Sequence, residues 1–322
     1  MARRRIGQLG WMDAAVGQRQ SKRRDVLSEL SALLDWSCFE VLLNGIHAAA
    51  KGEPAYPPLM MLKVLLLQRW YGLSDPAMEE ALSDRLSFQR FCGLSLEDET
   101  PDHTTIWRFR ETLSRTGLDA VLLTELNRQL DGHGVLLKQG TLIDASLVRS
   151  AARRPRVEEG KTSTIDPDAR FGANNERRFY TFGYKMHIAV DAGSNIVRDA
   201  RLTSANIQEI GVATELVQGD EAEVLADRGY DARSLHDHLS ARGIVDGVMR
   251  RGQRGKPLAA EAVTRNHELA VRRRPVEAIF GTLKRCYRFH RMRYFNLMRN
   301  RLAVVLACFA YNLKRCYALT AS

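Results

Sequence analysis

The sequence predicts an α/β protein in which a mixed five-stranded sheet flanked by helices follows an all-helical N-terminal domain. The chain has 322 residues, enough for about two domains of ordinary size. Apolar residues recur at helical spacing up to about residue 135, and from about residue 140 they form shorter runs with β character. Hydrophobic residues make up 45% of the chain and charged residues 27%, which excludes a fully disordered or fibrous protein.

The N-terminal domain, residues 1–135, is expected to be built from helices. Residues 25–50 carry leucines at helical spacing, and the strongly apolar segment Leu59–Tyr71 is expected to be a buried helix that ends at Gly72. Ser74 and Asp102 are expected to cap the helices that follow them, because their side-chain oxygens can accept hydrogen bonds from free backbone amides.

The helix that begins after Asp102 follows another helix across a short polar segment and carries Arg108 and Arg110. This arrangement is similar to a helix-turn-helix, and we expect the two arginines or nearby side chains to contact DNA. Many helical pairs with this pattern bind nothing, so a purely structural pair is the competing interpretation.

The second domain, residues 136–295, is expected to hold the sheet. A strand over Thr141–Val148 precedes residues 149–178, which are predicted to be a polar insertion, partly disordered until bound, because they lack apolar periodicity. The remaining elements are strands at 182–191, 196–203, 223–226 and 244–249, helices at about 206–218 and 232–242, and a helix that Pro275 starts or kinks. This order is expected of an RNase H-like domain. Residues 296–322 form an apolar C-terminal helix and a candidate dimer contact.

Three acidic residues stand out by their positions. Asp144 lies inside the first strand, where a carboxylate has no structural reason to be. Asp227 directly follows a strand, at the end where α/β sheets commonly bind ligands, and Glu277 lies on a late helix among arginines. Crowded carboxylates repel one another unless a cation is present, and hard oxygen ligands suit Mg²⁺ or Mn²⁺. We expect the three acids to bind two Mg²⁺ ions and to cleave a phosphodiester.

Each acid also has a simpler interpretation. Asp144 could pair with an arginine, Asp227 could cap a turn, and Glu277 could form a surface ion pair with Arg273 or Arg274. Taken singly, these simpler interpretations are favoured. Taken together, on these elements and in this order, the three positions favour a metal site.

The charge of the chain points to a polyanionic partner. The chain has 48 Lys and Arg residues against 38 Asp and Glu residues, a net charge of +10. This excess favours nucleic acid binding, although a basic surface kept for solubility is the alternative. The longest apolar runs fall far short of the about 20 residues of a membrane span, and no secretory signal is found. Five scattered cysteines without zinc spacing indicate reduced thiols, so we expect a cytoplasmic protein that associates with the nucleoid when bound to DNA.

Several segments together resemble the bacterial DDE transposases of the IS-four/IS-five superfamily of insertion sequences, and most closely the IS-five branch. The first is Pro101-Asp102-His103-Thr104-Thr105 within a helical region. The others are Thr141–Val148, Gly183–His187, Leu225–Asp231 and Arg272–Lys284. Within the last segment, Arg273, Glu277 and Lys284 match the family's Y-R-E-K signature, whereas Ala270 stands in the tyrosine position.

The resemblance implies a transposase that binds the terminal inverted repeats of an insertion sequence as a homodimer on double-stranded DNA. It implies hydrolysis at the element ends and transfer of the freed 3′ ends to target DNA, with Asp144, Asp227 and Glu277 holding two Mg²⁺ ions, for which Mn²⁺ can substitute. Arg273 and Lys284 would contact DNA near the metal. Lys185 and His187 face the same way on the second strand, and one of them is expected to approach the scissile phosphate, with a core histidine as the competing interpretation. For Arg274 and Arg285, a solvated basic face competes with direct DNA contact.

Three further points stay open at the level of sequence. Asn206 and Glu209 resemble a family motif that follows the third strand, and they either support the site or cap a helix. An RNase H-like nuclease or resolvase without strand transfer is one competing function. A non-catalytic DNA-binding regulator is the other, and the intact acidic trio argues against it.

Overall fold

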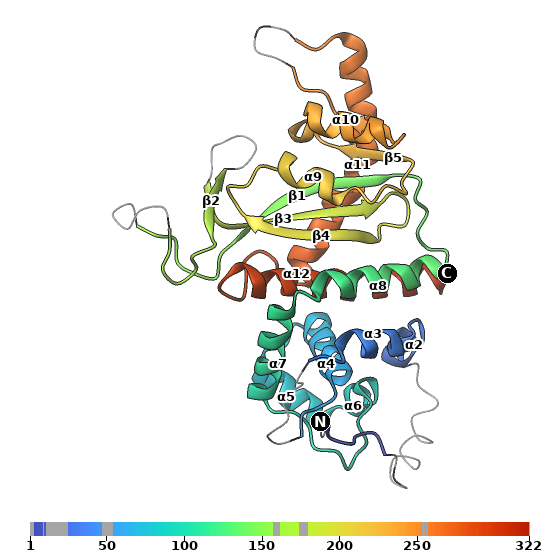
Figure 1. Cartoon of the computed structure of the whole chain (residues 1–322), viewed down its shortest axis with the longest axis vertical. Coiled ribbons are helices and arrows are strands. Elements are labelled where there is room, and N and C mark those ends of the chain that lie inside the picture. The colour runs from blue at the N-terminus through green and yellow to red at the C-terminus, as the bar shows by residue number, and fades with distance from the viewer. Residues whose placement is uncertain are drawn as a thin grey trace. The chain divides into compact units, whose positions relative to one another are not determined.

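The computed structural model of the chain describes residues 3–8, 10, 25–46, 54–156, 162–173, 180–252, 255 and 257–321 (Figure 1). The chain divides into two compact units. One comprises Met1–Gln129 together with Phe309–Ser322, and the other comprises Leu130–Cys308. The long helix α12 (Leu297–Thr320) therefore contributes to both units.

The first unit is helical, as the sequence predicts. Gly72 ends helix α4 in a left-handed conformation with a φ of 64°, which glycine adopts without steric cost. Both predicted caps are confirmed: Ser74 Oγ accepts a hydrogen bond from the Ala77 amide at 3.2 Å, and Asp102 Oδ1 accepts one from the Thr105 amide at 2.7 Å. The helices are α2 (Val26–Ala32), α3 (Trp36–Leu43), α4 (Pro58–Tyr71), α5 (Asp75–Asp84), α6 (Leu86–Cys92), α7 (His103–Thr116) and α8 (Asp119–Gly132).

Residues from the end of the chain complete the core of the helical unit. The Phe309 ring lies 5.4 Å from the ring of Phe39 and 6.5 Å from that of Trp36, and Trp70 Nε1 donates a hydrogen bond to the Ala310 carbonyl at 2.8 Å. By length and composition α12 could cross a bilayer, but 67% of its most apolar window is buried inside the protein. Buried core helices of soluble proteins can have the same length and apolar composition, so α12 is only weak evidence for a membrane span. Its apolar residues 302–310 are buried within the single chain.

The second unit holds a mixed sheet. Strand β3 pairs antiparallel with β1 on one edge and with β2 and β4 on the other, and β5 pairs parallel with both β1 and β6. The described part of the chain contains the strands β1 (Thr141–Arg149), β2 (Arg170–Ala173), β3 (Tyr180–Asp191), β4 (Val197–Ser204), β5 (Glu223–Ala226) and β6 (Val245–Val248). The helices of this unit are α9 (Ile210–Leu216), α10 (Arg233–Ala241) and α11 (Ala260–Cys286), with the single-turn 3-10 helix η2 (Arg228–Tyr230).

Helices cover both faces of this sheet. The sequence alternation places Ile143 on the face that packs against Val212 and Leu216 of α9, in a cluster that also includes α10. Asp144 points to the opposite face, where α11 crosses β1 (Figure 1). The last residue of β5 is Ala226, so the loop that follows it lies beside the middle of β1.

The expected polar insertion is partly ordered, and the prediction of five strands is wrong because this segment contributes a sixth, β2. Asp166 is fully buried, and its carboxylate accepts hydrogen bonds from the Ser150 and Tyr184 hydroxyls at 2.5 Å. These bonds anchor the segment to β1 and β3. Residues 157–161 and 174–178 of the predicted insertion lie outside the described residues.

The expectation that Pro275 starts or kinks a helix is corrected in part. Helix α11 begins 15 residues earlier, at Ala260, and continues through Pro275 to Cys286. Proline removes one backbone donor inside the helix, but the surrounding turns keep the chain helical. As a result, Arg273 and Glu277 lie on one continuous helix, one turn apart.

Candidate active site

The first two predicted carboxylates lie side by side on neighbouring strands. Strands β1 and β5 run parallel, with Ile143 opposite Ala226 as the last pair in register. The next position in this register sets Asp144 beside Asp227, at the carboxyl end of β5, where parallel strands commonly present functional side chains. The structure therefore brings together two acids that are 83 residues apart in the chain.

The Asp144 carboxylate is desolvated. The pKa of Asp144 is raised to about 6, mainly by burial and to a smaller extent by the nearby carboxylates of Asp227 and Glu209. Two contacts act in the other direction: Arg273 Nη2 lies 3.4 Å from Asp144 Oδ2, and the Ala145 amide donates to Asp144 Oδ1 at 2.8 Å. The predicted alternative, a pairing of Asp144 with an arginine, is thus also present. Its lowering effect on the pKa of Asp144 is smaller than the raising effect of burial.

Glu209, the residue before α9, is a further carboxylate near Asp227. Its side chain makes no capping hydrogen bond to α9. A Cβ atom added to Gly229 would lie 2.8 Å from Asp227 Oδ1 and 3.1 Å from Glu209 Oε2. Both carboxylates therefore line the space above Gly229, and only glycine leaves that space open. Asp227 Oδ1 accepts a hydrogen bond from the Gly229 amide at 2.7 Å, so this residue serves as a cap and also faces Glu209.

The third predicted carboxylate, Glu277, lies on the side of α11 that faces β1. Arg273 precedes it by one turn and reaches Asp144, and Lys284 follows it by two turns and donates to Ser146 Oγ at 2.7 Å. Glu277 lies between these two contacts along the helix, and its side chain is exposed. The pKa of Lys284 is lowered, because its ammonium group is partly buried against the strand.

The carboxylates fit a hard divalent cation by their chemistry. Asp227 and Glu209 offer oxygen ligands around the space above Gly229, and Asp144, which contacts Arg273, offers a further carboxylate beside Asp227. Among the described residues, no three His, Cys, Asp or Glu side chains stand close enough to form a ready metal site. The carboxylate oxygens are thus suitable ligands for a divalent cation, but among the described residues Glu277 does not form a cluster with Asp144 and Asp227.

Lys185 is not free to contact DNA in this structure, which corrects the expectation for this residue. It is 9% exposed, and its ammonium group donates to the Ile207 carbonyl at 2.9 Å and lies 3.3 Å from Glu209 Oε1. His187, on the same strand, is fully buried and bonds Thr203 Oγ1 at 2.9 Å. Burial lowers the pKa of His187 to about 3, so this ring is neutral at physiological pH, as in a core histidine.

Arg110 is also corrected, because it is buried inside the helical unit. It is 4% exposed, and its guanidinium bonds the carboxylate of Asp75 on α5 and Gln68 Oε1 on α4. This group holds three helices together and is not available to a DNA backbone. The other predicted DNA contacts, Arg108, Arg274 and Arg285, have exposed side chains.

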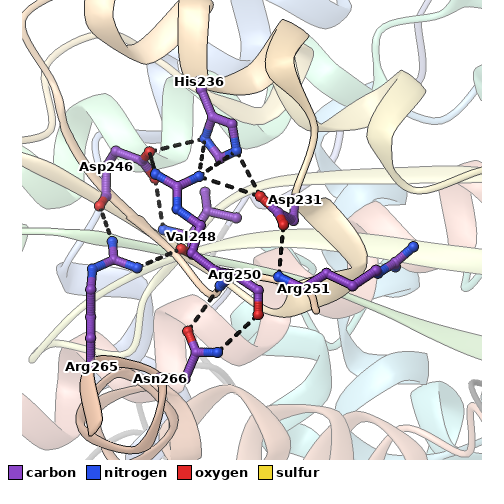
Figure 2. Close-up of polar contacts among 8 residues, drawn as sticks. All are labelled: Asp231, His236, Asp246, Val248, Arg250, Arg251, Arg265 and Asn266. Atoms are coloured by element: carbon purple, nitrogen blue, oxygen red, sulfur yellow. Dashed lines mark hydrogen bonds and ion pairs between the residues drawn. The ribbon is translucent and has the colours of Figure 1, made fainter. Parts of the chain in front are cut away.

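A polar network fixes the segment behind Asp227 (Figure 2). His236 lies between two carboxylates, with Nε2 2.9 Å from Asp231 Oδ1 and Nδ1 2.9 Å from Asp246 Oδ2. Arg250 pairs with the same two carboxylates, at 3.3 Å and 2.7 Å. Asn266 of α11 exchanges two hydrogen bonds of 2.9 Å with the Arg250 backbone. The network ties the end of η2, the helix α10 and the strand β6 to α11, and so holds the loop that carries Asp227.

The sequence did not identify Tyr230 as a residue of the site, and it left Glu209 without a defined role. Both residues reach the site through the fold, Glu209 from the start of α9 and Tyr230 from η2. A signal for Tyr230 was present in the segment Leu225–Asp231, where an aromatic residue follows Asp227 by three positions. Periodicity alone assigns such a ring to the core, and the ring does lie there.

Comparison with known proteins assigns both halves of the chain to transposase families. Residues 15–112 match the family described as a transposase domain (DUF772), and residues 136–313 match the family described as a transposase DDE domain. Asp144, Asp227 and Glu277 all lie within the second match.

Solved transposase structures are similar to the chain only distantly. The piggyBac transposase synaptic complex with hairpin DNA has 9% sequence identity and a TM-score of 0.43, over 90% of this chain and 72% of that chain. A pre-cleavage Mos1 transpososome has 11% identity and a TM-score of 0.20, over 82% of this chain and 98% of that chain. The Mos1 strand transfer complex has 13% identity and a TM-score of 0.19, over 89% and 85% of the two chains. These values are too low to carry an argument.

The match to the transposase DDE domain spans more than half of the chain by itself. The protein therefore belongs to the DDE transposases, enzymes that cleave DNA and transfer its strands.

Proposed function

We propose that this transposase acts on the terminal inverted repeats of a bacterial insertion sequence of the IS-five branch, through an RNase H-like catalytic domain. The strand order supports this domain type: β1 pairs antiparallel with β3, which pairs with β4, and β1 pairs parallel with β5 followed by β6. The observation that carries the proposal is the register that sets Asp144 beside Asp227 at the end of β5.

We propose that Asp144, Asp227 and Glu277 hold the divalent cations, with Glu209 beside Asp227. Two such ions would supply activation of the attacking oxygen and stabilisation of the leaving oxygen of a phosphodiester. Arg273 keeps the Asp144 carboxylate ionised and oriented in the metal-free protein, because its guanidinium lies 3.4 Å from that carboxylate. Lys284, held over β1 by Ser146, is positioned to bind a phosphate of the DNA.

The helical unit supplies recognition of the element ends in this proposal. Arg108 on α7 is exposed and close in sequence to the capped start of that helix, where phosphate and base edges are commonly contacted. Arg274 and Arg285 are exposed on α11 and would contact the DNA backbone. Two element ends must be held at once, so the active form would be a homodimer, working in the cytoplasm on nucleoid DNA.

The test is an in vitro assay with a plasmid that carries inverted repeats, together with precut ends and Mg²⁺ or Mn²⁺. We expect the wild-type protein to cut at the repeats and to join precut 3′ ends to target DNA. We expect Asp144→Asn, Asp227→Asn and Glu277→Gln each to abolish both reactions, whereas Asp237→Asn, which changes a carboxylate 69% exposed on α10, leaves them intact.

Each competing function gives a different result in the same assay. Cutting without joining of precut ends would indicate a nuclease or resolvase. Binding of the repeats without either reaction would indicate a regulator. Full activity of Glu277→Gln alone would show that the third ligand is another residue, with Glu209 as the nearest carboxylate to the two aspartates.

A further inference from the structure

The side chain of Tyr230 is fully buried, and its hydroxyl has no hydrogen-bond partner among the residues that the structure describes. The ring packs in the apolar cluster beneath α9 and α10, with Leu235 and Val212 among its neighbours in that cluster. A buried hydroxyl without a partner is rare and unfavourable, because it has lost water and gained nothing in exchange. Its persistence in an otherwise apolar cluster points to a state of the protein in which the hydroxyl is bonded.

Tyr230 lies next to residues of the candidate site, because η2, which carries Tyr230, contacts α9, which Glu209 precedes. Burial raises the pKa of Tyr230, and the carboxylates of Glu209, Asp144 and Asp227 raise it further, in that order, while Arg273 lowers it. The hydroxyl is therefore neutral at physiological pH and keeps its proton to donate. Glu209 is the carboxylate acceptor that lies against the backbone next to Tyr230, because its Oε2 atom is 3.1 Å from the position of a Cβ atom on Gly229.

Within the described part of the chain, Lys185 is the ion-pair partner of Glu209. Lys185 lies 3.3 Å from its Oε1 atom, while its Oε2 atom lines the space above Gly229 together with Asp227 Oδ1. A carboxylate beside a cation-binding aspartate has to be oriented, since donors behind such ligands fix their direction and their basicity. One additional donor, on the side of Tyr230, would complete this support.

We propose that Tyr230 is a positioning residue of the active site, whose buried hydroxyl donates a hydrogen bond to Glu209 when a divalent cation binds and so fixes that carboxylate beside Asp227. This inference rests on the proposed function, because it requires a cation at Asp144 and Asp227. The hydroxyl touches neither DNA nor the reacting phosphate, so its effect on catalysis passes through Glu209 and the cation.

The substitution Tyr230→Phe separates this role from a structural one. It keeps the ring and removes an unpartnered hydroxyl, so the thermal midpoint of the full-length protein in EDTA is expected to stay the same or to rise. We expect the Kd for Mn²⁺, measured by titration calorimetry, to rise by about 10-fold or more. DNA cleavage is expected to fall by a similar factor at limiting Mn²⁺ and to recover at saturating Mn²⁺.

Tyr184→Phe is the matched control, because Tyr184 is also fully buried in the sheet-containing unit but its hydroxyl donates to Asp166 at 2.5 Å. It is expected to lower the thermal midpoint and to leave the Kd for Mn²⁺ unchanged. In a Glu209→Gln background, Tyr230→Phe should weaken Mn²⁺ binding much less than in the wild type, because both changes interrupt one connection.

The outcomes separate the inference from the function on which it rests. A wild-type Kd for Mn²⁺ in Tyr230→Phe, or a loss of stability alone as in the Tyr184 control, overturns the positioning role and leaves the transposase function standing. The positioning role is also overturned if the effects of Tyr230→Phe and Glu209→Gln on the Kd for Mn²⁺ are fully additive in the double variant. Failure of the wild-type protein to bind Mn²⁺ overturns the proposed metal site itself, and the role of Tyr230 with it.

Discussion

Asp144 carries a charge that strand β1 largely removes from water. Its pKa is raised to about 6 by burial, against about 4 for an aspartate in an unfolded chain. The folded protein therefore binds this proton more tightly than the unfolded chain, and Asp144 makes folding less favourable as the pH rises from about 4 to about 6. The difference corresponds to up to about 3 kcal/mol above pH 6, an upper value because the side chain keeps 21% of its exposure.

Asp144→Asn should thus stabilise the metal-free protein at pH 7.5, although we expect it to abolish catalysis. The gain in free energy of unfolding, measured by denaturant titration in EDTA, should shrink as the pH falls and vanish near pH 4. Added Mn²⁺ should reverse the order, because it stabilises the wild type through the carboxylate and not the variant. Equal stabilities of the two proteins at pH 7.5 in EDTA would contradict the raised pKa.

Arg110 is expected to matter for folding and not for DNA contact. Arg110→Met leaves the Asp75 carboxylate without its cation, so we expect a loss of about 3 kcal/mol in the free energy of unfolding. This is the lower end of the usual range, because Asp75 retains 21% exposure. The control Arg108→Ala should change stability by no more than about 0.5 kcal/mol and should weaken binding of repeat DNA in a mobility-shift assay. The reverse pattern would place Arg110 on the DNA surface.

At the scale of one helix, the start of α7 depends on its cap. Asp102 accepts the Thr105 amide and the Thr104 hydroxyl, at 2.7 Å and 2.8 Å, and these bonds lower its pKa to about 2. Asp102→Ala should cost about 1 kcal/mol of stability, measured by denaturant titration, whereas Asp102→Asn should retain most of it. If Asp84→Ala, a change at an exposed aspartate in the last turn of α5, proved as costly as Asp102→Ala, the capping role would be wrong.

Most elements could be predicted because the signals that define them are local. The hairpin turn at Ala192–Asn195, the strand β5 and the end of α4 at Gly72 all follow from side chains within a few residues of each feature. Strand β2 could not be predicted, because four residues in a polar segment carry no periodicity and pair only through β3. The length of α11 was missed because Pro275 indicates a helix start more strongly than the turns before it indicate a helix.

At the scale of the whole molecule, only part of the candidate site could be predicted from the sequence. The positions of Asp144 and Asp227 at the end of β5 could be predicted, since a carboxylate inside a strand and one directly after a strand conflict with structural expectations. The roles of Glu209 and Lys185 could not, because their mutual contact at 3.3 Å depends on how α9 begins beside β3. Arg110 carried no sign of its buried partner Asp75, which lies 35 residues away on another helix.

The division of α12 between the two units also bears on how the protein is made. Because Phe309 and Ala310 contact Trp36, Phe39 and Trp70, the helical unit cannot close its core until these late residues have left the ribosome. A frameshift or premature stop before residue 309 would release a nascent product with exposed aromatic rings, which proteases remove. Truncated translation products therefore would not persist as folded helical units beside the intact enzyme.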